Sequence, residues 1–127
     1  MDLQEYFENT KGVGIIATAD NSGKVDIAVY AKPHFMEDGT IAFIMADRLT
    51  HTNLQSNNHA AYLFMEEGSK SKGKRLFLTK FREEKDSDLL YSLRSNKYSS
   101  EKEEEKERFL VFFKIEKILP LIGSGEK

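Results

Sequence analysis

The chain has 127 residues, a mass of 14.6 kDa and a formal net charge of −2, and it contains 39% hydrophobic and 31% charged residues. This length predicts one domain, residues 1–127, with enough chain to bury a core, and the composition is that of a globular protein rather than a fibrous or disordered one. The absence of cysteine excludes disulfides and thiolate metal sites, and the slightly acidic balance gives no support for nucleic acid as a partner.

The chain is predicted to contain short helices and longer strands. At the N-terminus Leu3, Tyr6 and Phe7 have helical spacing, which predicts an amphipathic helix that covers one end of the fold. Further along, Asp86 is expected to cap a helix whose three leucines face inward. The expected elements, in chain order, are a helix at 1–10, strands at 12–19, 25–34 and 40–46, a helix at 50–57, strands at 60–66 and 74–83, a helix from Asp86 that carries Leu89, Leu90 and Leu93, a solvated linker at 99–108, and a strand at 108–118.

The six expected strands are joined mostly by turns of hairpin length, so the sheet is predicted to be antiparallel. Several of the strands, that at 40–46 among them, are apolar on both faces, which a single solvated sheet does not tolerate. A small closed barrel explains this pattern, because one face fills the interior while the other packs on helices or on a second subunit. The sequence therefore predicts a mainly β, six-stranded antiparallel barrel and a homodimer.

A basic stretch raises the possibility of a phosphate-binding loop. Residues 70–85 hold seven Lys or Arg against two Glu, and the segment from Gly68 to Lys74 fits the spacing G-x-x-x-x-G-K. The next residue is Arg75 rather than Ser or Thr, so no hydroxyl is available for magnesium, and the chain continues as a strand instead of a helix. Nucleotide hydrolysis is not supported, and the basic patch is typical of a solvated face.

The three histidines, His34, His51 and His59, are scattered without metal-ligand spacing, so a metal site is not predicted. No nucleophile elbow supports hydrolase chemistry. Tyr30, His34 and His51 are the only candidates for a general acid or base, and none has a motif around it.

The start of the helix at 50–57 offers a better candidate. If Thr50 is the N-cap, the first-turn amides of His51, Thr52 and Asn53 are unpaired and carry part of the positive end of the helix dipole. Such an end binds phosphate, and Arg48 with the Thr50 and Thr52 hydroxyls would add donors. The alternative is a plain Thr cap, with Asn53 completing a weak capping box. The residues alone leave both interpretations open.

The order of these elements resembles the pyridoxamine 5′-phosphate oxidase-like family, and its short FMN-binding split-barrel proteins in particular. The resemblance covers essentially the whole chain. Its most specific motif is Thr-x-x-Asn-Leu-x-x-Asn, which Thr50, Asn53, Leu54 and Asn57 match. The resemblance implies a homodimeric split barrel with one FMN in each of two clefts at the interface.

The resemblance also implies where FMN would lie. The phosphate would be held at the start of the helix, and the ring edge would lie against the second strand and the end of the third. Residues of the partner chain commonly close the cleft, for which Lys74, Arg75 and Lys80 or the C-terminal Leu121 and Ile122 are candidates. The predicted cofactor-binding residues are Ala28, Val29, Tyr30, Met45, Ala46, Arg48, Thr50, His51, Thr52, Asn53, Lys74 and Arg75.

One position departs from the family. Many relatives have a lysine or arginine immediately before the threonine, where this chain has Leu49. Arg48, or a basic residue of the strand at 74–82, is expected to replace the missing charge. Otherwise FMN would bind weakly or another ligand would take the cleft, since relatives exist that use deazaflavin or haem.

The leading hypothesis is a flavin-dependent oxidoreductase whose substrate the sequence does not name. The alternatives are a non-catalytic flavin carrier or electron-transfer module, and a small barrel that binds protein or nucleic acid, which the acidic balance disfavours. No apolar run reaches the roughly 18 residues needed to span a bilayer. The N-terminus carries acids where a signal peptide carries bases, so a cytoplasmic protein is predicted.

Overall fold

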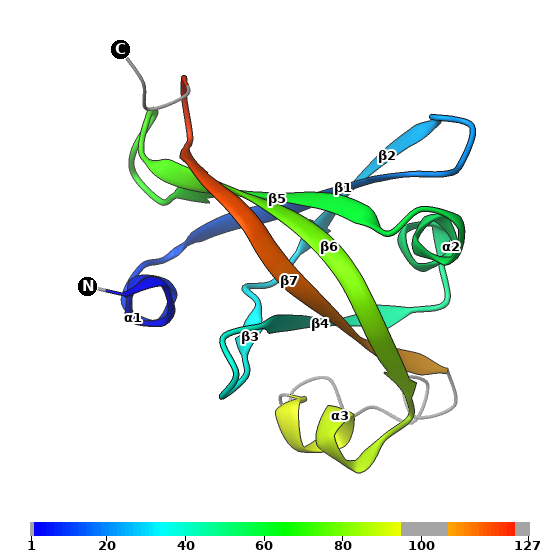
Figure 1. The fold of residues 1–127 in the computed structure, drawn as a ribbon. Helices are drawn as coiled ribbons and strands as arrows, with labels where there is room; N and C mark the ends of the chain where they lie inside the picture. Colours follow the sequence, from blue (N-terminus) through cyan, green and yellow to red (C-terminus); the bar gives the residue numbers. More distant parts are fainter. Residues whose placement is uncertain (1, 95–106, 124–127) are drawn as a thin grey trace.

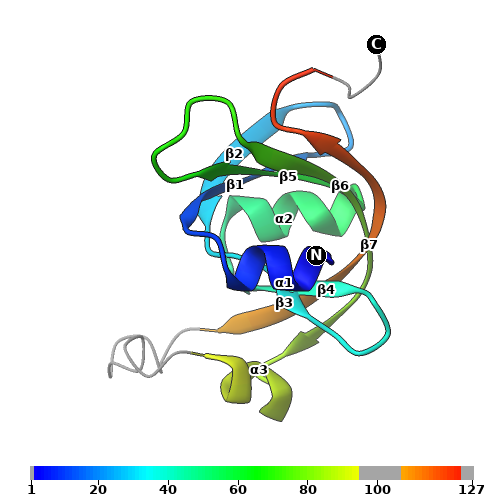
Figure 2. The ribbon, with the colours of Figure 1, turned by 90° about the vertical axis from the view of Figure 1, so that its left-hand side faces the viewer.

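In the computed structural model, which describes residues 2–94 and 107–123, the chain forms one antiparallel sheet that curls into a half-barrel. The strand order is β2-β1-β5-β6-β7-β4-β3, and Figures 1 and 2 show α1 and α2 at opposite ends of the curled sheet. The elements are α1 (Leu3–Glu8), β1 (Gly12–Ala19), β2 (Val25–Tyr30), β3 (His34–Phe35), β4 (Ile41–Ala46), α2 (Leu49–Ser56), β5 (His59–Glu66), β6 (Gly73–Lys85), α3 (Asp88–Leu93) and β7 (Arg108–Pro120).

The described sheet has seven strands rather than the predicted six, because the segment at 25–34 forms two strands. Pro33 lacks the N–H that a continuous ladder needs, so β2 ends at Tyr30 and the chain re-enters the sheet at His34. In the gap, Lys32 points back to the helix end, where its Nζ donates to Phe7 O at 2.7 Å and to Thr10 O at 2.9 Å. The antiparallel pairing is confirmed for every neighbouring pair of the described sheet.

The interior of the half-barrel is filled by alternate residues of the strands, as period-two patterning predicts. At one end Phe7 of α1 is buried, and its ring lies 5.0 Å from that of Phe64 and 6.2 Å from that of Tyr62, centroid to centroid. The prediction that the N-terminal helix covers one end is confirmed. The buried cluster consists of Phe7, Ile16, Ile41, Phe43, Met45, Leu54, Ala60, Tyr62, Phe64, Leu76, Leu78, Phe109, Val111 and Phe113.

A second apolar cluster lies on the outer side of β4 and β7, beneath α3. Ala42, Leu110 and Phe112 point outward here, and Leu90 of α3 packs against them. These four residues, Ala42, Leu90, Leu110 and Phe112, are called the covered cluster below. The apolar outer face of β4 and β7 is thus covered by a helix of the same chain.

The start of α3 differs from the prediction. Strand β6 continues to Lys85, and Ser87 rather than Asp86 is the N-cap, with its Oγ accepting from Leu90 N at 3.1 Å. Asp86 instead has a φ of 49°, and its carboxylate accepts from Arg108 N at 3.2 Å. Of the three leucines predicted to face inward, Leu90 is fully buried and Leu93 is partly buried, whereas Leu89 is exposed by 39% and points outward.

The outer side of β2, β1 and β5 carries an apolar surface that no described helix covers (Figure 1). In the ladder Ile15 lies opposite both Val29 of β2 and Leu63 of β5, so the outward residues of the three strands form one surface. Val25, Ile27 and Val29 are exposed by 80%, 70% and 76%. We call this surface the uncovered face: Val13, Ile15, Val25, Ile27, Val29, Leu63 and Met65.

Two further predictions concern segments that the structure describes only in part. Most of the predicted solvated linker at 99–108 lies outside the described residues. Within the described part of the chain, none of the helices has the length and apolar character that a membrane crossing requires.

Candidate functional site at the start of α2

A cleft of about 450 Å³ lies where β2, the end of β4 and the start of α2 meet. Its volume falls in the range of small-molecule sites, roughly 300–1,000 Å³. The lining combines apolar residues with a polar end, where Asp26 contacts Thr50 at the start of α2. The lining residues are Asp26, Ala28, Val29, Tyr30, Ala31, Ile44, Ala46, Arg48, Leu49 and Thr50.

Strand β2 supplies one wall of the cleft through three alternating residues. Asp26, Ala28 and Tyr30 are half-buried and share one face of the strand, because side chains repeat with period two. The end of this strand is held by Tyr62, whose hydroxyl donates to Ala31 O at 3.1 Å. Gly14 makes room for that contact, since a Cβ there would lie 1.9 Å from the Tyr62 hydroxyl oxygen. The cleft wall is therefore anchored to the barrel interior.

The start of α2 differs from the expected geometry. Arg48, not Thr50, is the N-cap, and its side chain makes no capping hydrogen bond. The first helical bond runs from Thr52 N to Arg48 O at 2.9 Å, so the first-turn amides without an intrahelical acceptor belong to Leu49, Thr50 and His51. The prediction of a Thr50 cap was wrong because extended backbone at Arg48 decides the cap, whichever side chain follows.

The polar end of the cleft combines one cation with one carboxylate. Arg48 is exposed, while Thr50 is buried and its hydroxyl donates to Asp26 Oδ2 at 3.3 Å. Burial raises the pKa of the Tyr30 phenol; the Thr50 hydroxyl opposes this rise, the charge of Asp26 adds to it, and Arg48 opposes it. Tyr30 is therefore protonated at neutral pH, and its hydroxyl belongs to the same polar group.

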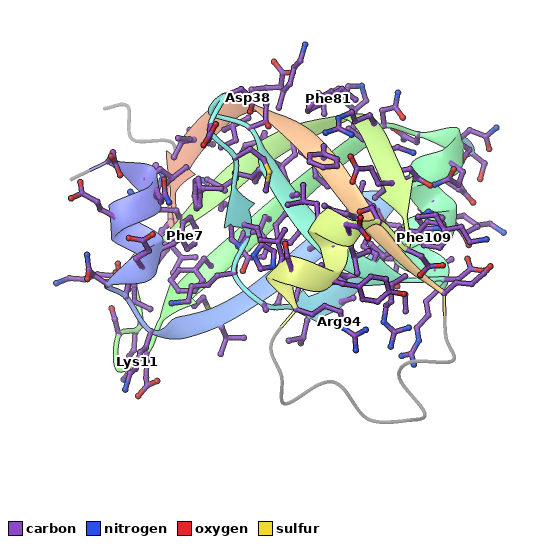
Figure 3. The ribbon with its side chains drawn as sticks, turned by 90° about the horizontal axis from the view of Figure 1, so that it is seen from below. Phe7, Lys11, Asp38, Phe81, Arg94 and Phe109 are labelled. Atoms are coloured by element: carbon purple, nitrogen blue, oxygen red, sulfur yellow. The ribbon has the colours of Figure 1, made fainter. Side chains whose placement is uncertain are left out.

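Two of the predicted binding residues turn away from the cleft into the fold. The ring of His51 stacks on Phe109 with a centroid distance of 3.8 Å, and its Nε2 lies 3.0 Å from Glu83 Oε2. Asn53 donates through Nδ2 to the hydroxyl of Thr18 at 3.1 Å, and both side chains are buried. These side chains fix α2 against β1, β6 and β7. Figure 3 shows Phe109 beside α2, at the end of the sheet opposite Phe7.

The remaining predicted residues lie elsewhere. Met45 is fully buried in the core, and Thr52 is exposed outside the cleft lining. Lys74 lies over the ring of Tyr6, 4.6 Å from its centroid, and the Arg75 guanidinium donates to Pro120 O at 2.9 Å and to Gly123 O. The structure thus brings together Ala28, Val29, Tyr30, Ala46, Arg48 and Thr50, and it places Met45, His51, Thr52, Asn53, Lys74 and Arg75 outside the cleft lining.

The charge missing at Leu49 is not supplied by the basic strand of the same chain. Lys80 donates to Leu54 O at 3.2 Å and pairs with Glu83 at 3.1 Å, and Arg82 pairs with Glu84. Among the described residues that line the cleft, only Arg48 is basic. Arg48 also borders a neighbouring hollow of about 340 Å³, where Arg108 is accompanied by Asp47 and Glu107.

Sequence reasoning missed Asp26. The signal was available, because Asp26 precedes Ala28 by two residues and Tyr30 by four, which places all three on one face of a strand.

Within residues 2–94 and 107–123, no group of three or more His, Cys, Asp or Glu side chains is arranged to hold a metal ion.

Comparison with protein-family models and with curated proteins finds no match for this sequence. Solved structures do match. An FMN-binding protein from Syntrophomonas wolfei has a TM-score of 0.70 at 20% identity, covering 92% of this chain and 82% of that one. A pyridoxamine 5′-phosphate oxidase-related, FMN-binding protein from Nostoc punctiforme has a TM-score of 0.65 at 14% identity, covering 87% and 75%. An F420 reductase has a TM-score of 0.68 at 11% identity, covering 93% and 97%.

These matches define the class of fold. The chain has the split-barrel fold of the pyridoxamine 5′-phosphate oxidase-like proteins, as the sequence resemblance predicted. At identities of 11–20% the likeness shows the fold alone.

The residues of the cleft fit a flavin in most respects. Ala28, Ile44 and Ala46 offer an apolar surface for a planar ring system, and Arg48 with the first amides of α2 offers donors for an anion. The departure is Asp26, which adds a negative charge where a phosphate would approach.

Proposed function

We propose that the protein binds FMN in the cleft between β2, β4 and α2 and acts as a flavin-dependent oxidoreductase. The observation that carries the proposal is the lining of the cleft, in which an apolar wall ends at Arg48 and the first turn of α2. The split-barrel fold supports it, because solved proteins of this fold include FMN-binding proteins.

The chain's own residues would have distinct roles toward the cofactor. The backbone and side chains of Ala28 and Ala46 would contact the ring, and Arg48 would place a permanently charged, forked donor on the phosphate. The protonated Tyr30 hydroxyl would donate a hydrogen bond at the polar end. FMN, when bound, supplies the hydride or electron transfer itself.

The direct test is the absorbance spectrum of the purified protein, followed by titration with FMN. Arg48→Ala should weaken FMN binding by about 1.5–3 kcal/mol, the range for a hydrogen bond to a charged group. The matched control is Arg82→Ala on β6, which removes the same charge from a residue paired with Glu84 outside the cleft. If the protein neither contains nor acquires flavin, the proposal fails.

Two alternatives are separated by measurement. A non-catalytic flavin carrier would bind FMN but oxidise reduced nicotinamide little or not at all, so turnover by the flavin-loaded protein distinguishes it from an oxidoreductase. A deazaflavin ligand is supported by the likeness to an F420 reductase, and titration with that cofactor tests it. Haem has less support, because none of the described cleft residues is a histidine or cysteine, which are common axial ligands.

We also propose that the protein is a homodimer joined through the uncovered face. Three β-branched side chains of β2 are exposed by 70% or more on one surface, and burying them against a second copy would remove apolar area from water. Val29 belongs to both this face and the cleft, so the dimer would complete the cleft wall, and Lys74 and Arg75 stay candidates for closing the partner's cleft. Light scattering at micromolar concentration should give twice the chain mass; a monomer would contradict the dimer.

A cytoplasmic location stays a prediction from the sequence.

A further inference from the structure

The polar end of the cleft carries a carboxylate that the proposed function does not use. Asp26 lies on the same strand face as Ala28 and Tyr30, lines the cleft and is half-buried. Its Oδ2 accepts a hydrogen bond from Thr50, the second residue of α2. Asp26 and Arg48 therefore flank the same helix start.

The charges at this end nearly cancel. Arg48 contributes one positive charge and Asp26 one negative charge, and the helix start adds roughly half a positive charge. A phosphate monoester at pH 7 carries about −1.5 to −2 charges. Its attraction to Arg48 is thus opposed by repulsion from Asp26, and Leu49 adds no further cation.

The chemistry of a carboxylate also indicates what Asp26 can bind. An ionised carboxylate only accepts hydrogen bonds, and so do the oxygens of a doubly ionised phosphate, so the two cannot pair. Hydroxyl groups can donate to it. The chain that links a flavin ring to its phosphate carries hydroxyls, and Thr50 occupies one oxygen of Asp26 while the carboxylate retains further acceptor positions.

We propose that Asp26 is a specificity-determining residue: it accepts hydroxyl groups of the flavin side chain and offsets Arg48, so that the cleft binds riboflavin about as tightly as FMN. This inference rests on the proposed flavin-binding function. A purely structural role for Asp26, confined to holding Thr50, would instead leave the preference between the two flavins unchanged when the carboxylate is removed.

The experiment is a pair of titrations, with FMN and with riboflavin, followed by flavin fluorescence. For the unmodified protein we expect the two dissociation constants to agree within about threefold, because the net charge of the polar end is small. Asp26→Asn keeps the shape and the hydrogen bond from Thr50 but removes the charge, and it should tighten FMN about tenfold while riboflavin stays unchanged or weakens. Glu116→Gln, which removes the same charge from an exposed position of β7, should change neither constant.

The outcomes separate this inference from the proposed function. If the unmodified protein prefers FMN by more than about tenfold, or if folded Asp26→Asn keeps the original ratio, the role of Asp26 is overturned while flavin binding stands. If neither flavin binds, both proposals fail. If Asp26→Asn does not fold, the ratio measured for the unmodified protein decides alone: agreement within about tenfold supports the inference, and a larger preference for FMN overturns it.

Discussion

Two regions of the outer side of the sheet carry similarly apolar residues but have different surroundings. The outward residues of β4 and β7, Ala42, Leu110 and Phe112, are fully or almost fully buried because Leu90 of α3 packs on them. The outward residues of β2 are just as apolar, yet they are exposed. An apolar outer face therefore does not by itself reveal its cover: α3 covers β4 and β7, whereas none of the described helices covers β2.

The largest expected effect is on the uncovered face. Ile27→Asp should dissociate the proposed dimer, because the contact would bury an unpaired carboxylate, and in a symmetric dimer twice; we expect a loss of about 3–5 kcal/mol of association free energy. Analytical ultracentrifugation of the variant measures this loss. Leu89→Asp on α3, at an apolar position exposed by 39%, is the matched control and should leave the association unchanged. Equal association of Ile27→Asp and the unmodified protein would contradict the assignment of this face.

On the covered cluster, Leu90→Ala should lower the free energy of unfolding by about 2–5 kcal/mol, since it leaves a cavity between α3 and β7. Urea denaturation measures the change. Leu89→Ala, on the exposed side of the same helix, should cost less than about 1 kcal/mol. Equal losses for the two leucines would mean that α3 does not cover the sheet in solution.

Leu49 lines the same cleft as Val29, which is part of the uncovered face. Leu49→Lys would restore a positive charge at the start of α2, and we expect it to tighten FMN by about 1 kcal/mol without tightening riboflavin. Paired titrations of the two ligands measure the difference. Leu49→Met is the uncharged control. A lysine that strengthens both ligands equally would act through packing rather than through the phosphate.

The smallest effect is expected at the polar contacts that hold α2. Burial raises the pKa of Glu83, but hydrogen bonds from Gln55, His51 and Lys80 outweigh it, and the net pKa lies below the ordinary value. A carboxylate with a lowered folded-state pKa stabilises the fold above the unfolded-state pKa, and this stability is lost as the pH falls through the folded-state value. Because Glu83 is partly exposed, about 0.2–1 kcal/mol is expected.

The measurement is urea denaturation at pH 7 and at pH 3. Glu83→Gln should lose stability at pH 7 and show a smaller difference between the two pH values than the unmodified protein. Glu116→Gln, which removes a carboxylate from an exposed position of β7, is the control. An unchanged pH dependence in Glu83→Gln would show that other carboxylates account for it.

The sequence by itself determined the elements, because their signals are local. Apolar runs between turns were enough to place the strands, and the helical spacing of Leu3, Tyr6 and Phe7 was enough to place the covering helix. Hairpin-length turns were enough to predict an antiparallel sheet. The errors are also local: Pro33 divided a predicted strand, the cap of α2 lies two residues before the predicted Thr50, and the cap of α3 lies one residue after the predicted Asp86.

Only the tertiary structure decided which residues share the cleft. Asp26 and Thr50 are 24 positions apart, and they meet because α2 packs against the ends of β1, β2 and β4. Helix α2 is oriented about its axis so that His51 faces Phe109 and Asn53 faces Thr18. The antiparallel course of β6 carried Lys74 and Arg75 to the far end of the sheet, near Tyr6 and Pro120. Periodicity places a residue on a face, but the packing of one element on another decides what that face meets.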